Sequence, residues 1–215
     1  MSDRMSCAIC HRRKAKRYCP GVRGHICSLC CGTERENTVD CPLDCAYLQE
    51  AHRYEFERAE RLAEMPYPNH ELTDEFLEQR EPFIGALALQ MLEQSLEHPG
   101  TLDTDLLAAL DSLIRTFETL ASGIYYESLP GTPIAEAHFR DLQMFVEEFR
   151  KGENERPKWT PLKDDDVLRA LVFLARLGRA RTNGRPRAKG YLDFLRQQFP
   201  QAVAHKTESG LIIPG

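Results

Sequence analysis

Cysteine is the residue type whose spacing could do chemistry in this chain. All eight cysteines fall within the first 45 residues, and none occurs in the 170 that follow. Thiols grouped in close pairs hold a metal ion or form disulfides. The eight are Cys7, Cys10, Cys19, Cys27, Cys30, Cys31, Cys41 and Cys45.

The rest of the sequence favours metal over disulfides. The segment before Cys7 has no apolar run of the kind found in secretory signals. No stretch approaches 18 uninterrupted apolar residues, so we expect no membrane span and no membrane partner. We therefore expect a cytoplasmic protein, and in that reducing compartment paired cysteines more often bind metal than cross-link.

The spacing of the cysteines suits zinc. A structural zinc ion takes four ligands in a tetrahedron and prefers thiolate sulfur and imidazole nitrogen. Eight ligands in four pairs would hold two zinc ions per chain. Cys31 is a ninth candidate, which could replace His25 or Cys30. The pairs are Cys7 with Cys10, Cys19 with His25, Cys27 with Cys30, and Cys41 with Cys45.

The order of these pairs resembles the cross-brace zinc fingers, which are the RING, B-box and HIT-type modules. The strings Tyr18-Cys19-Pro20 and Ile26-Cys27-Ser28-Leu29-Cys30 look most like the HIT type. The resemblance covers about the first 45 residues, and Cys31 and the wide Cys41/Cys45 pair depart from the pattern. The head is also similar to small bacterial proteins with an I-C-x-x-C-C-G cluster, a likeness that implies no activity. The cross-brace resemblance implies one site of Cys7, Cys10, Cys27 and Cys30, and another of Cys19, His25, Cys41 and Cys45.

Such sites would be structural. Binding energy on the order of 10 kcal/mol per zinc would act as folding energy for a segment with few large apolar residues. Protein ligands would fill every position, which leaves none for water or substrate, so we expect no enzyme activity. An iron–sulfur cluster is an alternative because it is also held by cysteine thiolates. Haem attachment at Cys7 to His11 is a weaker alternative, because that chemistry usually belongs to exported proteins. Thiol redox chemistry through a single pair is also weaker, because it leaves the other six cysteines without a role.

Charge is distributed unevenly along the chain. Residues 1–48 carry a net +3, residues 49–168 carry −15 and residues 169–215 carry +7. The basic ends could contact nucleic acid or another anion, or they could pair with the acidic middle. The candidate anion contacts are Arg12, Arg13 and Lys14 in the head, and Arg176, Arg179, Arg181, Arg185, Arg187 and Lys189 near the carboxyl end.

Helical periodicity begins directly after the cysteines and predicts the element that must carry them. We expect a helix from Cys45 to about Met65, ended by Pro66, and an antiparallel helical bundle beyond it. Apolar stripes at helical spacing predict further helices at 82–97, 103–122, from Thr132-Pro133 to about 152, from Thr160-Pro161 through 175, and at 187–199. A short helical segment at 72–79 is a further possibility. Short hairpins are expected only in the head.

The sequence thus predicts a mainly α protein with a cysteine-rich module at 1–48, a helical bundle at 49–200 and a tail at 201–215. The leading hypothesis is a non-enzymatic zinc-binding adaptor or regulator with a protein partner. The alternatives are a nucleic-acid-binding regulator that uses the arginine-rich corner at 176–189, and an iron–sulfur redox or sensor protein.

Overall fold

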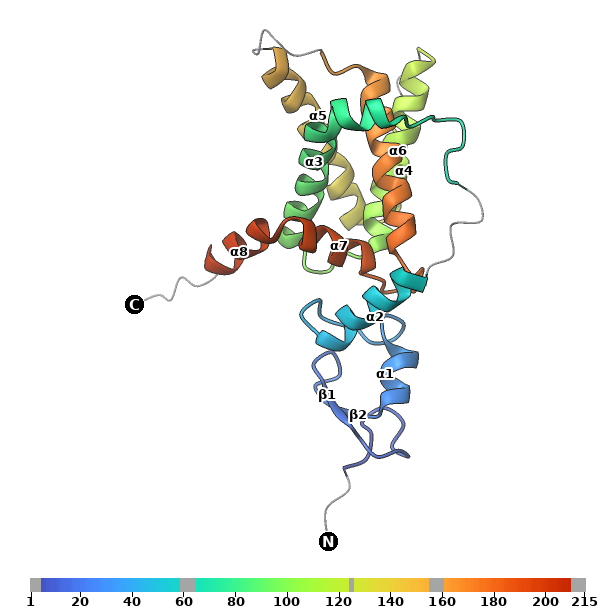
Figure 1. Ribbon diagram of the computed structural model, residues 1–215, viewed down its shortest axis with the longest axis vertical. Coiled ribbons are helices and arrows are strands. Elements are labelled where there is room, and N and C mark those ends of the chain that lie inside the picture. Colours follow the sequence, from blue (N-terminus) through green and yellow to red (C-terminus); the bar gives the residue numbers. More distant parts are fainter. Residues whose placement is uncertain (1–4, 59–64, 124–125, 155–160, 210–215) are drawn as a thin grey trace.

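A cysteine-rich head and a helical body lie end to end in this protein (Figure 1). The structure, a computed structural model, describes residues 5–58, 65–123, 126–154 and 161–209. Within these ranges there are eight helices and one two-stranded sheet. The mainly α fold with a cysteine cluster at its amino end confirms the fold class predicted from sequence. No helix in the described ranges has both the length and the apolar character needed to cross a bilayer.

The head is a hairpin followed by two helices. Strands β1 (Arg17–Cys19) and β2 (Gly24–Ile26) pair antiparallel, with Tyr18 opposite His25. Helix α1 (Ser28–Glu34) follows directly, and α2 (Ala46–Arg58) starts after the last cysteine, as the sequence predicted. The expected continuation of α2 toward Met65 lies outside the described residues at 59–64.

Four long helices form the body. They are α3 (Asp74–Glu97), α4 (Asp103–Ala121), α5 (Pro133–Asn154) and α6 (Asp164–Arg181). Helix α4 packs against both α5 and α6, and α3 packs against the same two helices. The predicted apolar stripe of α4 is buried in the core, where Leu106, Leu110, Leu113 and Ile114 have no exposed surface.

Not all neighbouring helices in the bundle are antiparallel. Thr132 precedes α5 and donates to the Asp105 carboxylate in the first turn of α4, at 2.8 Å. At the far end, the Arg150 guanidinium of α5 lies over the ring of Phe117 near the end of α4. Helices α4 and α5 therefore run parallel, because one contact joins their starts and the other joins their far ends.

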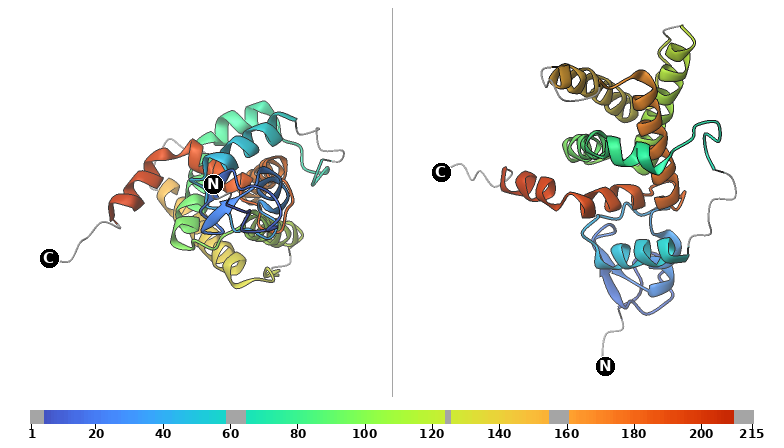
Figure 2. Two further views of the ribbon diagram at one scale, coloured as in Figure 1. Left: turned by 90° about the horizontal axis from the view of Figure 1, so that it is seen from below. Right: turned by 45° about the horizontal axis from the view of Figure 1, so that its top comes forward.

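Two further helices join the body to the head. Helix α7 (Gly190–Gln198) lies across the end of the bundle nearest the head, and α8 (Pro200–Ser209) extends outward from it (Figures 1 and 2). The buried Asp103 carboxylate accepts hydrogen bonds from the backbone amides of Tyr191 and Leu192, both at 3.1 Å. These bonds satisfy amides in the first turn of α7 that have no partner within the helix. The start of α4 thus fixes the start of α7.

Candidate metal centre

Four thiols converge in the head to form a group that could hold a metal ion. The sulfur atoms of Cys7, Cys10, Cys27 and Cys30 all lie within 4.8 Å of one another. No other set of three or more potential metal ligands meets as closely within the described ranges. The pairs come from two separate segments, as in the first site that the cross-brace resemblance implied.

Local backbone geometry brings these pairs together. The His11 amide bonds to the Cys7 carbonyl at 2.8 Å, and His11 adopts a positive φ of 55°, which closes a tight turn around the first pair. Cys27 caps α1, where its sulfur accepts the Cys30 amide at 3.4 Å. The Cys27 amide in turn donates to the Cys7 sulfur at 3.2 Å, which connects the two turns. Amide donors aimed at sulfur favour the thiolate form, which is the form that binds metal.

The pKa values of Cys7 and Cys30 are shifted in opposite directions. Burial alone would raise the pKa of Cys7, but backbone hydrogen bonds from Cys10, Cys27 and Ile9 outweigh it and bring the pKa to about 6. Burial and three neighbouring sulfurs raise the pKa of Cys30 to about 12. A divalent cation at the centre would remove this repulsion, because its charge stabilises all four thiolates together. The donor set therefore fits a thiophilic metal ion.

The other four cysteines line one small cavity of about 20 Å³ in the same head. Their sulfurs do not all approach one another within 4.8 Å, in contrast to the first group. Burial raises the pKa of Cys41, and the nearby charges of Cys19 and Cys45 act in the same direction. The cavity therefore brings together Cys19, Cys31, Cys41 and Cys45.

His25 lies on the outer side of the hairpin. It is exposed, and its ring meets the Tyr18 ring edge-on, with 5.5 Å between centroids. Side chains alternate between the two faces of a strand, so the burial of Ile26 places His25 on the opposite face. The structure does not bring His25 into the group of four thiols.

Most of the carboxyl-terminal basic residues contact groups within the protein. The Arg176 guanidinium donates to the carbonyls of Pro66, Tyr67 and His70 at 2.8–2.9 Å. One terminal nitrogen of Arg179 donates to both oxygens of the Asp111 carboxylate, at 2.7 and 2.8 Å, which is a pairing with the acidic middle of the chain.

The segment from Asn183 to Lys189 binds the head. Arg185 donates to the carbonyls of Gly32 and Arg35, the latter at 2.6 Å. Lys189 Nζ donates to the Asp40 carboxylate at 2.6 Å and to the Cys41 carbonyl at 3.4 Å. The Arg187 side chain is exposed. This half of the arginine-rich corner therefore serves as the docking surface for the segment between α1 and α2.

A buried polar network, which no sequence motif predicts, lies at the centre of this docking surface. Glu36 is fully buried, and its carboxylate accepts from His52 at 2.9 Å, from Asn183 at 2.8 Å and from the Lys189 amide at 2.7 Å. The other nitrogen of His52 lies 3.0 Å from the Asp193 carboxylate. Burial alone would lower the pKa of His52, but the two carboxylates raise it to about 9. Both ring nitrogens can then donate, as in a protonated imidazole.

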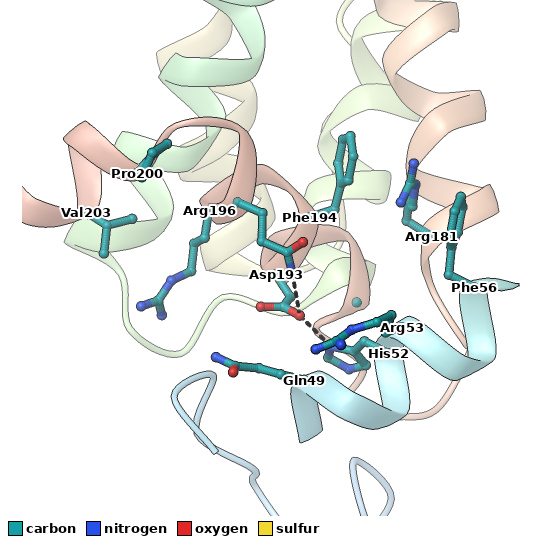
Figure 3. Close-up of a pocket in the computed structure, with 12 residues that line it drawn as sticks. Gln49, His52, Arg53, Phe56, Arg181, Asp193, Phe194, Arg196, Pro200 and Val203 are labelled. Atoms are coloured by element: carbon teal, nitrogen blue, oxygen red, sulfur yellow. Dashed lines mark hydrogen bonds and ion pairs between the residues drawn. The ribbon is translucent and has the colours of Figure 1, made fainter. Parts of the chain in front are cut away.

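A pocket of about 530 Å³ opens beside this network, between α2, α7 and α8 (Figure 3). Its lining includes Arg53, Arg181 and Arg196. Arg181 lies between two rings, 3.5 Å from the centroid of Phe56 and 4.0 Å from that of Phe194. Burial lowers the pKa of Arg181. The guanidinium therefore helps to pack α2 onto α7.

The basic residues of the head have a different environment. Arg12, Arg13 and Lys14 are all exposed in the loop between the first cysteine pair and β1. They are the predicted anion contacts that project from the metal-binding end of the molecule.

Comparison with protein-family models, with curated proteins and with solved structures found no match to this chain. A function must therefore be argued from the chain's own residues. The feature that carries such an argument is the group of four convergent thiols, which could hold a metal ion.

Proposed function

We propose that this chain is a non-enzymatic zinc-binding adaptor of the cytoplasm, and that its head holds two structural zinc ions. The observation that carries the proposal is the convergence of the Cys7, Cys10, Cys27 and Cys30 sulfurs within 4.8 Å. Thiolate is a preferred zinc donor, and four protein ligands complete a tetrahedron with no open position. This supports a structural rather than a catalytic metal.

The composition of the head supports the count of two ions. Its buried cluster consists of Ile26 and three cysteines, so little apolar surface holds it together. Four further cysteines remain for a second tetrahedron. Metal binding would then supply the folding energy that the head lacks.

Metal analysis tests the proposal directly. We expect protein purified without added metal to be colourless and to contain about two zinc ions by elemental analysis and native mass spectrometry. Cys10→Ser should lower the content by about one ion, whereas Ser28→Ala, a change at an exposed neighbour, should leave it unchanged. A brown protein with broad visible absorbance would establish the iron–sulfur alternative. A metal-free chain whose head stays folded in EDTA would overturn the proposal.

An exposed aromatic surface supports an adaptor role. Tyr18, Tyr47 and Tyr54 are each at least 40% exposed, and the Arg17 guanidinium lies 4.0 Å from the centroid of the Tyr47 ring. Tyrosine and arginine are enriched at protein interfaces, where a stiff amphipathic ring binds at low entropic cost. A hollow of about 260 Å³ adjoins Arg17, Tyr47 and Tyr54. We propose this surface as the contact with a protein partner.

Paired variants test the surface. We expect a partner captured by cross-linking in cells to remain bound at high salt and to be lost from the Tyr47→Ala/Tyr54→Ala double variant. Tyr126→Ala, which removes an even more exposed tyrosine from the body, should keep the partner. Equal capture by both variants would refute this surface.

The loop with Arg12, Arg13 and Lys14 favours nucleic acid as the second candidate partner, because these side chains are exposed. Each phosphate contact adds salt-dependent affinity through counterion release. Binding to a labelled oligonucleotide should then weaken steeply with salt. Replacing the three residues with alanine should reduce that slope, whereas a change at Arg185, which bonds to backbone carbonyls of the head, should affect stability first.

A further inference from the structure

We infer that the second zinc ion is held by Cys19, Cys31, Cys41 and Cys45, without His25, and that this ion fixes the contact between head and body. The inference rests on the zinc binding proposed above. It names the ligands of one site and gives that site a role that the first site does not have.

The hairpin separates Cys19 from His25. Tyr18 and His25 face each other across the two strands and are both exposed. Because side chains alternate along a strand, Cys19 points to the other face, together with the buried Ile26. Cys19 and His25 therefore cannot direct their donor atoms at one ion.

Helix α1 directs its two adjacent cysteines to different sites. Successive residues of an α-helix are rotated by about 100° around its axis. Cys30 points to the first group of thiols, whereas Cys31 lines the cavity of Cys19, Cys41 and Cys45. The Cys31 sulfur also lies 4.0 Å from the Arg17 guanidinium on β1. Cys31 thus completes a set of four thiols on the side of the head that faces α2.

The cavity has the size of a single-ion site. Its volume of about 20 Å³ leaves room for about one water-sized particle. Its lining includes four cysteines and carries no acidic side chain or histidine. No three of these sulfurs lie within 4.8 Å of one another in the described residues, so the cysteine side chains would have to turn toward the cavity to bind an ion. The donor set of four thiols selects a thiophilic metal such as zinc.

The four cysteines also lie next to the groups that bind the body. The Glu36 backbone hydrogen-bonds to the Cys41 thiol, and the Glu36 carboxylate accepts the Lys189 amide at 2.7 Å. The Cys41 carbonyl accepts from Lys189 Nζ. Cys45 directly precedes α2, which carries His52 to Asp193 on α7. An ion bound to Cys31, Cys41 and Cys45 would therefore tie the segment that docks on the body to α1 and to the start of α2.

Metal counts in matched variants test the ligand set. We expect Cys31→Ser to retain about one zinc ion per chain and His25→Ala to retain about two. If His25→Ala loses an ion and Cys31→Ser does not, the inference fails while the proposed function stands. A wild-type chain without zinc would refute both.

A measurement on the wild-type chain covers the case in which a variant does not fold. In zinc-loaded protein, we expect Cys31 to resist alkylation as strongly as Cys19, Cys41 and Cys45, and to become reactive together with them when a chelator is added. Alkylation of Cys31 at the same rate with and without chelator would overturn the assignment.

Hydrogen exchange tests the role of the ion. The Lys189 amide should exchange at least tenfold faster in Cys31→Ser, because its acceptor Glu36 is no longer fixed. Cys10→Ser, which disrupts the first site, should change this amide much less. Equal acceleration in both variants would show that the second site has no special role in docking.

Discussion

Glu36 shows how a single residue joins the two parts of the molecule. It is fully buried and has a positive φ of 51°. Burial disfavours its charge, but hydrogen bonds from His52, Asn183 and the Lys189 amide outweigh this and lower its pKa. A buried carboxylate is tolerated only when it is paired in this way. The contact between head and body therefore depends on the protonated state of His52.

Stability should fall with rising pH through this histidine. Its pKa is about 9 in the folded protein, against an ordinary value of 6.5. A raised pKa stabilises the fold fully below pH 6.5, and the contribution disappears as the pH rises through 9. We expect the stability difference between wild type and His52→Gln to shrink by on the order of 3 kcal/mol over that range. Urea unfolding of both proteins at constant zinc measures it.

The control for this experiment is His70→Gln. The His70 pair with Glu118 is partly exposed, so its loss should cost less than about 1 kcal/mol. Stability curves for wild type and His52→Gln that stay parallel from pH 6 to pH 9.5 would contradict the assignment of a charged His52.

At the scale of elements, α6 and α7 approach each other closely at one glycine. A Cβ built on Gly178 would lie 2.7 Å from the Tyr191 ring and 2.9 Å from the Leu107 side chain. Tyr191 is fully buried, so its ring has little space to move. The absence of a side chain at position 178 therefore sets the distance at which α7 crosses the end of the bundle.

Gly178→Ala should consequently destabilise the protein, although alanine favours helices. Overpacking of this kind costs about 1–3 kcal/mol, which exceeds the helix-propensity gain of about 1 kcal/mol. Gly152→Ala is the matched control, because a Cβ at this helical position of α5 meets nothing within 4 Å. It should stabilise slightly. Thermal unfolding measures both variants. An equal rise in unfolding temperature for the two would refute the packing argument.

The sequence predicts the start of one helix correctly, where a capping residue and a proline at the first helical position occur together. The prediction of a helix from Pro133 is confirmed, with Thr132 accepting the Ala135 amide as a cap. The predicted start at Pro82 is wrong, because α3 begins at Asp74 and includes this proline. The carbonyl of Glu78 that Pro82 leaves without a partner belongs to an exposed residue, where water can bond to it. The helix predicted to open at Thr160-Pro161 begins instead at Asp164, and Thr160 itself lies outside the described residues.

Long-range contacts limited the prediction of the site. Cysteine spacing was enough to group Cys7, Cys10, Cys27 and Cys30, because two short turns position them. The role of Glu36 and His52 could not be predicted, since their partners lie some 140–150 residues away in the sequence. The prediction from residue 201 onward is a tail, whereas α8 begins at Pro200, and a proline at the first helical position is a helix-start signal.

The whole molecule combines two parts that are stabilised differently. The body has a continuous core built from α3 to α7, with many fully buried leucines. The head buries mainly cysteines and Ile26. Hydrophobic burial therefore stabilises the body, whereas the proposed zinc ions stabilise the head.

Chelation should consequently unfold the head alone. We expect EDTA to release zinc and to abolish exchange protection in residues 5–45, while amides in α4 and α6 stay protected. Hydrogen exchange with mass spectrometry resolves the two regions. Added zinc should restore the head, whereas added magnesium should not. Loss of protection in the body at the same chelator concentration would show that the two parts fold as one unit.

The separation of Glu36 from Lys189 also orders events during synthesis. The head leaves the ribosome before the body and could bind its metal within its own 45 residues. The acceptor for its docking contact is then ready, but the Lys189 amide is made about 150 residues later. At about 5–20 residues per second, this interval lasts roughly 8–30 s. The nascent head therefore lacks this contact throughout the interval, and the contact forms only after the segment around Lys189 has emerged.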